Sequence, residues 1–136
     1  MTETQNSKQP EIQNSKQAEV QSSKQYDLED RTFEFARRVR AFVKKLPRTA
    51  SNFEDGKQLI RSSGSIGANY IEANESLSKK DFALRVKISR KEAKESRYWI
   101  RLVEIDSEAV EEERKVLIAE VTELMKIFGA IIEKLT

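Results

Sequence analysis

A row of basic side chains follows one side of a helical stretch in the second half of the chain. Its members recur every three or four residues: Lys87, Arg90, Lys94, Arg97 and Arg101. Cations with this spacing can follow a polyanion by displacing the counterions condensed on its phosphates. The same spacing is typical of a solvated helix flank, or of basic partners for an acidic neighbouring helix. This basic row is therefore a candidate phosphate-binding surface, and the simpler alternative stays open.

A second polar row lies in the preceding helical stretch, beside an apolar seam. Its members occur at i, i+4, i+8 and i+11: Arg61, Ser65, Asn69 and Glu72. Gly64 and Gly67 cost about 1 kcal/mol each relative to Ala inside a helix, so close approach of another helix is the expected compensation. We expect this polar row to form hydrogen bonds across helices, with Glu72 holding a basic group of the third helix. The alternative, a catalytic Ser65 or Glu72, lacks a His or Cys as base.

The composition removes most enzymatic chemistry. The chain has no Cys and no His, so it lacks disulfides, thiol nucleophiles, imidazole acid–base groups and the usual zinc ligands. Di-iron sites in helical bundles use Glu-x-x-His pairs, and Glu92-x-x-Glu95 is the nearest approach to one. We therefore expect a protein that is not an enzyme and holds no metal ion and no cofactor. A hydrolase that works with carboxylates alone is the remaining enzymatic alternative.

Four helices are needed to position these rows. Gly (4) and Pro (2) are scarce and charged residues make up 35%, which is a helix-rich composition. Apolar residues recur at helical spacing over 29–46, 53–77, 79–104 and 108–135. Pro47 would end the first stretch, and the expected N-caps of the others are Asn52, Ser78 and Ser107. Short connections make neighbouring helices antiparallel, so we predict an all-α, antiparallel up-down-up-down four-helix bundle.

The third helical stretch has two apolar faces, although a helix in a monomeric bundle needs only one. Val86, Ala93 and Ile100 on the first face can pack into the bundle. The second face, flanked by Tyr98, holds larger side chains: Leu84, Ile88, Trp99 and Leu102. Aromatic residues are enriched at interface cores, so we predict that this second face is a contact between subunits. Alternatively, these side chains cover the ends of the core or lie singly on the surface.

The start of the chain contains an eight-residue polar repeat. The segment Gln5-Asn6-Ser7-Lys8-Gln9 recurs unchanged at 13–17 and in altered form at 21–25. Such a segment buries too little apolar surface to offset its ordering entropy. We therefore predict a disordered polar tail over 1–26 and a single bundle domain over 27–136. We find no run of 18 apolar residues and no signal-peptide pattern, so we expect a cytoplasmic protein without membrane contact.

Several motifs together resemble one known family over about residues 27–136. They are Gln58-Leu59-Ile60-Arg61-Ser62, Ser65-Ile66-x-x-Asn69-x-x-Glu72, Asp81-Phe82 and Lys91-Glu92-Ala93-x-Glu95-Ser96-x-Tyr98-Trp99. The chain is similar to the four-helix bundle proteins encoded in intervening sequences of bacterial 23S ribosomal RNA genes. This resemblance implies a homopentameric barrel without catalytic residues. It also implies a relation to the accessory variability determinant proteins of diversity-generating retroelements, which are basic pentamers that bind nucleic acid and a reverse transcriptase.

Two functions are consistent with these patterns. The first is a non-enzymatic oligomeric bundle that binds RNA or another nucleic acid through the basic row. The alternative is a protein–protein interaction scaffold that does not bind nucleic acid. In that case acidic side chains of the fourth helix would neutralise the basic row across a subunit boundary: Glu108, Glu111, Glu112 or Glu113.

Overall fold

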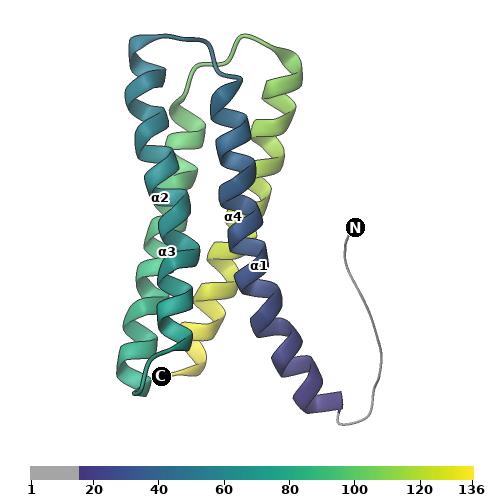
Figure 1. The fold of residues 1–136 in the computed structure, drawn as a ribbon, viewed down its shortest axis with the longest axis vertical. Helices are drawn as coiled ribbons and strands as arrows, with labels where there is room; N and C mark the ends of the chain where they lie inside the picture. The colour runs from purple at the N-terminus through teal and green to yellow at the C-terminus, as the bar shows by residue number, and fades with distance from the viewer. Residues whose placement is uncertain (1–15) are drawn as a thin grey trace.

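The computed structural model describes residues 16–136, with side chains from Leu28 onward. This part of the chain consists of four helices and no strand: α1 (Lys16–Lys44), α2 (Ala50–Asn74), α3 (Lys79–Leu102) and α4 (Glu108–Lys134). The helices run alternately up and down. The α1–α2 and α3–α4 connections lie at one end, and the α2–α3 connection lies at the other with the C-terminus (Figure 1). The predicted all-α four-helix bundle is confirmed.

The core is a continuous apolar layer to which all four helices contribute. Each helix packs against two others: in the described chain α1 contacts α2, α2 contacts α3, α3 contacts α4, and α4 closes the bundle against α1. The largest fully buried side chains include members of every helix: Phe35, Phe42, Leu59, Ile66, Ile100, Leu124 and Phe128. Burying a side chain of this size contributes about 1.5–3 kcal/mol relative to leaving it exposed. The helical spacing of apolar residues therefore gives each helix one apolar side, and burial of these four sides against one another stabilises the bundle.

Hydroxyl side chains define where three of the helices begin. Ser78 accepts a hydrogen bond from the Asp81 N–H, and Ser107 accepts one from the Val110 N–H, so both are N-caps as predicted. The prediction that Asn52 caps α2 is wrong. Thr49 is the N-cap, and its hydroxyl accepts a hydrogen bond from the Asn52 N–H at 3.1 Å.

The ends of α1 and α2 differ from the predicted ones. α2 stops at Asn74, and Leu77 in the following connection is fully exposed at 101%. α1 starts at Lys16, whereas the apolar spacing predicted a start near 29. The tail predicted over 1–26 falls in part on residues 1–15, which lie outside the described residues.

Small side chains let the helices approach closely. The Ser96 hydroxyl on α3 donates to the Ser62 hydroxyl on α2 at 2.9 Å, and the Ser89 hydroxyl donates to the Ile66 carbonyl at 2.9 Å. All three serines are fully buried, so these hydrogen bonds satisfy polar groups that water does not reach. The α2–α3 pair is therefore held in one register, and this register fixes the direction in which α3 presents its other sides.

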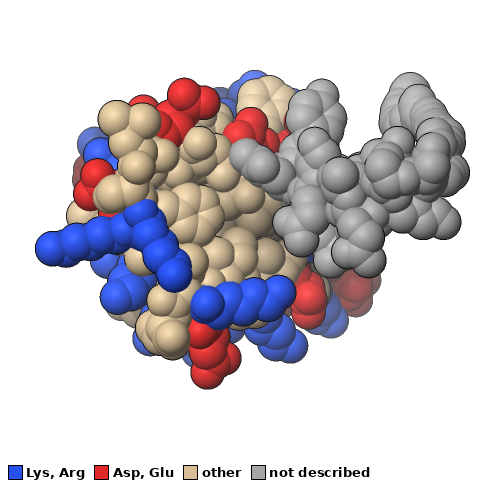
Figure 2. Space-filling model, turned by 90° about the horizontal axis from the view of Figure 1, so that it is seen from below, with Lys and Arg blue, Asp and Glu red and all other residues tan. Residues whose placement is uncertain are grey.

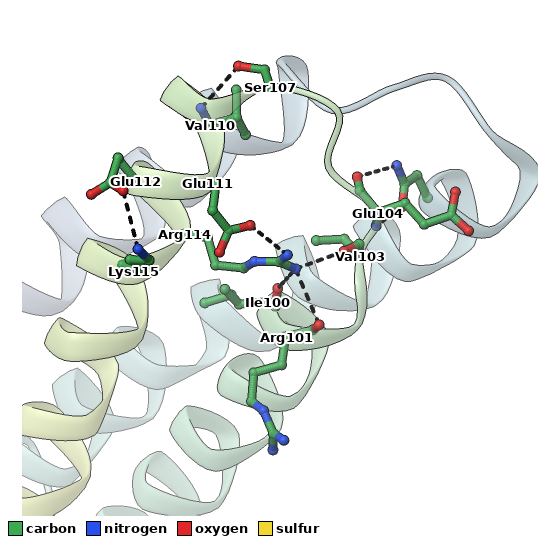
Figure 3. A network of polar contacts seen from close by, with 11 residues as sticks. Ile100, Arg101, Val103, Glu104, Ser107, Val110, Glu111, Glu112, Arg114 and Lys115 are labelled. Atoms are coloured by element: carbon green, nitrogen blue, oxygen red, sulfur yellow. Dashed lines mark hydrogen bonds and ion pairs between the residues drawn. The ribbon is translucent and has the colours of Figure 1, made fainter.

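A polar network locks the end of the bundle where α3 passes into α4 (Figure 3). One nitrogen of the Arg114 guanidinium donates to the carbonyls of Ile100, Arg101 and Val103 at 3.2, 3.2 and 2.8 Å. These carbonyls belong to the last turn of α3, where no further backbone N–H can reach them. Arg114 therefore caps the C-terminus of α3 and ties it to the first half of α4.

Candidate nucleic-acid interface

A cationic groove runs between α3 and α4. It encloses about 570 Å³ and is lined by two helices: Arg90, Lys91, Lys94 and Arg97 from α3, and Thr122, Met125 and Lys126 from α4. Five of these seven side chains are cations, and none is a carboxylate. We call this the α3–α4 groove. It joins three members of the basic row to Lys126, which comes from a different helix.

Two arginines of the groove are positioned by α4. The Arg97 guanidinium donates to the Thr122 hydroxyl at 3.1 Å. The Arg90 guanidinium lies over Gly129, 3.5 Å from the place where a Cβ would be. A small residue at 129 thus makes room for the Arg90 side chain across α4. Both guanidinium groups line the groove, and neither forms an ion pair with an acid whose side chain is described.

The remaining members of the basic row extend the surface along α3. Lys87 and Arg101 are exposed and do not line the groove itself. At a rise of 1.5 Å per residue, the row from Lys87 to Arg101 covers about 21 Å of helix. No ion pair neutralises any of its five members among the side chains described from residue 28 onward.

The acidic residues of α3 lie on the side of the helix away from this groove. Glu92 and Glu95 face α2, where the Arg61 guanidinium contacts their carboxylates at 3.3 and 3.0 Å. Glu92 is almost fully buried, so Arg61 neutralises a carboxylate that has little access to water. On the α2 side of α3 the carboxylates are therefore paired with a cation, whereas the members of the basic row form no ion pair among the side chains of residues 28–136.

The acidic residues of α4 pair with cations outside the basic row. Glu111 binds Arg114, Glu112 binds Lys115 and Glu113 binds Lys45 of α1. The hydrogen bond from Arg114 lowers the pKa of the Glu111 carboxyl. Within one chain, these three carboxylates do not neutralise the basic row.

Two members of the predicted polar row of α2, Arg61 and Asn69, form hydrogen bonds with α3, whereas Ser65 forms its hydrogen bonds within α2. Asn69 accepts a hydrogen bond from Arg85 of α3 at 3.0 Å and donates to the Ser65 carbonyl at 2.9 Å. Ser65 in turn donates to the Arg61 carbonyl at 2.9 Å. Glu72 is exposed, and Asn69 takes the basic partner on α3 that we expected for Glu72.

The second apolar face of α3 is partly open to solvent. Leu84 and Leu102 are 56% and 48% exposed, and Tyr98 beside them is 55% exposed. Ile88 and Trp99 are half-buried, and Trp99 packs partly against the core. Leu84 and Leu102 are therefore the members of the predicted interface that the bundle leaves uncovered.

The end of the bundle with the C-terminus has a different character (Figure 2). Uncharged residues occupy its centre, and long basic and acidic side chains project from its rim. This end shows no continuous cationic surface, so the basic groove is a feature of the side of the bundle.

Residues 28–136 provide no group of three or more Asp or Glu side chains that could hold a metal ion. No helix in the described part of the chain is long and apolar enough to cross a membrane.

Thr122 and Lys126 of α4 also line the groove, and neither was predicted from the sequence. Lys126 is an isolated cation in a helix rich in acids, and it contacts Glu123 at 3.7 Å. The sequence indicates only that Lys126 follows Thr122 by four residues, so that both lie on the same side of α4, away from its buried apolar residues.

These features define a small all-α up-down bundle with a cationic groove along one side. The family model described as 23S rRNA-intervening sequence protein matches residues 24–130. The chain belongs to this family, which confirms the resemblance found in the sequence motifs.

A solved structure supports the same assignment. It is the crystal structure of a protein with unknown function from the S23 ribosomal protein family of Bacteroides thetaiotaomicron VPI-5482. The two sequences are 34% identical, the alignment covers 77% of this chain and 97% of that one, and the TM-score is 0.68. None of the curated proteins compared with the chain matches it.

Proposed function

We propose that this protein is a non-enzymatic, homo-oligomeric bundle that binds RNA or another nucleic acid through the α3–α4 groove. The observation that carries this proposal is the lining of the groove, where five cations from two helices meet without a carboxylate. Lys126 contacts Glu123, but the other four cations form no ion pair among the side chains of residues 28–136, and clustered unpaired cations cost folding free energy through repulsion. Binding to a polyanion relieves this repulsion and releases condensed counterions.

The partition of charge on α3 supports the proposal. A solvated flank of a surface helix normally mixes both signs, and the α2 side of α3 does so through Arg61, Glu92 and Glu95. The α4 side has no such compensation from Glu111, Glu112 or Glu113, which are paired elsewhere in the chain. The basic row therefore fits the phosphate-binding interpretation better than the flank interpretation.

Self-association would multiply this surface. Leu84 and Leu102 are exposed on α3, and Phe33 of α1 and Ile71 of α2 are exposed elsewhere on the bundle, at 67% and 49%. A closed ring joins two different patches of each subunit, whereas a two-fold dimer uses one patch twice. Exposed apolar side chains on α1, α2 and α3 are consistent with a ring, and a ring would display one α3–α4 groove per subunit.

Filter binding of a labelled RNA hairpin at 50 and 200 mM salt tests the binding. For five phosphate contacts on a single strand, the affinity is expected to fall about a hundredfold between these concentrations. The double variant Lys87→Glu with Lys94→Glu should lose most of the binding. The matched control, Arg48→Glu with Lys57→Glu, makes the same change of charge at exposed positions away from the groove and should retain it. Lack of retention at 50 mM, or equal binding by both double variants, contradicts the proposal.

An interaction scaffold without nucleic-acid binding is the second candidate. Phe53 is 66% exposed and lines a groove where α1 passes into α2. The lining combines apolar Val43, Leu46, Pro47 and Ile60 with the cations Lys44, Arg48 and Lys57. This second groove contains no member of the basic row. Its exposed apolar side chains suit an apolar segment of a partner protein. A stable oligomer that fails to retain RNA at low salt would favour this candidate.

A further inference from the structure

We infer that Tyr98, which lies beside the α3–α4 groove, stacks on an unpaired base of the nucleic acid bound there, so that the protein selects single-stranded segments and loops over duplexes. This inference rests on the proposed nucleic-acid binding and adds the class of nucleic acid. It concerns a residue that lies outside the basic row and outside the four predicted interface side chains.

Tyr98 does not line the α3–α4 groove but lies beside it, on the strip of α3 between the cations and Leu102 of the proposed subunit contact. It follows Lys94 by four residues and precedes Arg101 by three, so helical geometry places its side chain beside both of them. The residue is 55% exposed, although a tyrosine ring gains free energy when it is covered. An exposed aromatic ring within a row of cations is the combination with which proteins bind single strands: cations contact the backbone and the ring stacks on a base.

The tyrosine ring is braced in place before any ligand arrives. Its centroid lies 5.0 Å from that of Trp99, with 79° between the two ring planes, which is an edge-to-face contact. Trp99 packs partly against the core, so the contact connects Tyr98 to a rigid part of the molecule. A ring fixed in this way loses little conformational entropy when a base stacks on it.

The shape of the surface disfavours a duplex. α3 is packed between α2 and α4, so only its outer side is open to a ligand. In duplex RNA the major groove is too deep and narrow for side chains to read, and the bases are already stacked on one another. The α3–α4 groove instead has Lys94 on one wall and Lys126 on the other, an arrangement that suits one backbone strand.

Fluorescence anisotropy with two labelled probes tests the inference: an unstructured 12-nucleotide RNA and a 12-base-pair RNA duplex, both at low salt. The full-length protein is expected to bind the single strand about tenfold more tightly, the value of about one stacked base. Tyr98→Leu keeps an apolar side chain but has no aromatic face, and it should remove this preference. Tyr98→Phe keeps the face and should preserve it. Trp99, the only tryptophan of the chain, adds a direct readout, since its emission should change on binding in the wild type and Tyr98→Phe.

The outcomes separate this inference from the proposed function. Equal affinity of the wild type for both probes overturns the selection for unpaired bases and leaves nucleic-acid binding intact. Unchanged single-strand affinity in Tyr98→Leu overturns the role of Tyr98. Failure of the wild type to bind either probe overturns the proposed function and this inference with it. Light scattering on both variants shows whether the oligomeric mass is retained, and circular dichroism shows whether the helices are.

Discussion

Asn52 and Glu104 join the two connections at one end of the bundle by a reciprocal pair of hydrogen bonds. The Glu104 N–H donates to the Asn52 side-chain oxygen at 2.8 Å, and the Asn52 side-chain N–H donates to the Glu104 carbonyl at 3.0 Å. The same side-chain nitrogen donates to the Pro47 carbonyl at 3.0 Å. One buried amide thus satisfies three backbone groups that belong to no helix.

Substitution of Asn52 should lower stability sharply. In Asn52→Ala the Glu104 N–H and carbonyl lose their partner, while the Pro47 carbonyl keeps a hydrogen bond from the Thr49 N–H, and the expected cost is about 2–4 kcal/mol in the free energy of unfolding. Chemical denaturation followed by circular dichroism measures the change. Asn69→Ala is a suitable control, since it removes an amide of the same type at a half-buried position where water can replace its contacts. Equal losses in the two variants would show that the Asn52 amide has no special role.

The burial of Glu92 should make Arg61 more important than a surface arginine. Arg61→Gln leaves the nearly buried Glu92 carboxylate without its cation, and a loss of about 1–2 kcal/mol is expected. Arg37→Gln breaks the exposed pair with Glu34 on α1, for which a much smaller loss is expected because water screens the two charges. The two denaturation midpoints give the comparison. A larger loss in Arg37→Gln would contradict the structural role of Arg61.

The fold follows from features that a sequence displays directly. Apolar spacing identified all four helices, and Ser78 and Ser107 marked two helix starts because a hydroxyl before a helix can accept from its free N–H groups. The same rule misplaced the start of α2. Thr49 and Asn52 are both good N-caps, and only the position of the Glu104 backbone decides that Asn52 serves a distant connection.

The α3–α4 groove could be predicted only in part, because residue spacing within one helix does not show which residues of another helix lie beside it. The basic row was visible because its members share one helix. The contribution of Lys126 depends on the register of α4 against α3, which packing at Thr122 and Gly129 determines. Likewise, helical spacing put Glu72 in line with the polar row, but the register of α3 brings Arg85 to Asn69. Pairing between helices had to come from the three-dimensional structure.

Two glycines at helix contacts should respond oppositely to alanine. A Cβ at Gly67 would lie 2.8 Å from the Thr32 hydroxyl oxygen, and Thr32 is itself fully buried, so Gly67→Ala should destabilise the bundle. A Cβ at Gly129 would make an ordinary contact with Arg90 at 3.5 Å. Gly129→Ala should therefore raise the free energy of unfolding by part of the roughly 1 kcal/mol by which Ala exceeds Gly in helix propensity. Thermal unfolding of both variants checks this, and Thr32→Ala should relieve the effect of Gly67→Ala.

Tyr70 should make the bundle less stable at alkaline pH. Burial raises the pKa of its hydroxyl above the ordinary value of 10.0. Above about pH 10 the unfolded chain releases this proton more readily than the folded chain, so stability falls as pH rises through that range. Tyr70→Phe removes the group and should weaken the dependence. Urea midpoints of both proteins at several values between pH 9 and 11 give the measurement, and parallel curves would argue against a buried, neutral hydroxyl.

The exposed apolar face of α3 should control the mass of the protein in solution. Leu84→Glu with Leu102→Glu places two charges on that face, and burying them between subunits would cost several kcal/mol, so the oligomer should dissociate. Multi-angle light scattering is expected to give a multiple of 15.7 kDa for the wild type and a value near 15.7 kDa for the variant. Leu77→Glu, at the fully exposed position in the α2–α3 connection, should leave the mass unchanged. A wild type that remains monomeric at micromolar concentration would remove the ring, and each α3–α4 groove would then have to bind its phosphates without neighbouring copies.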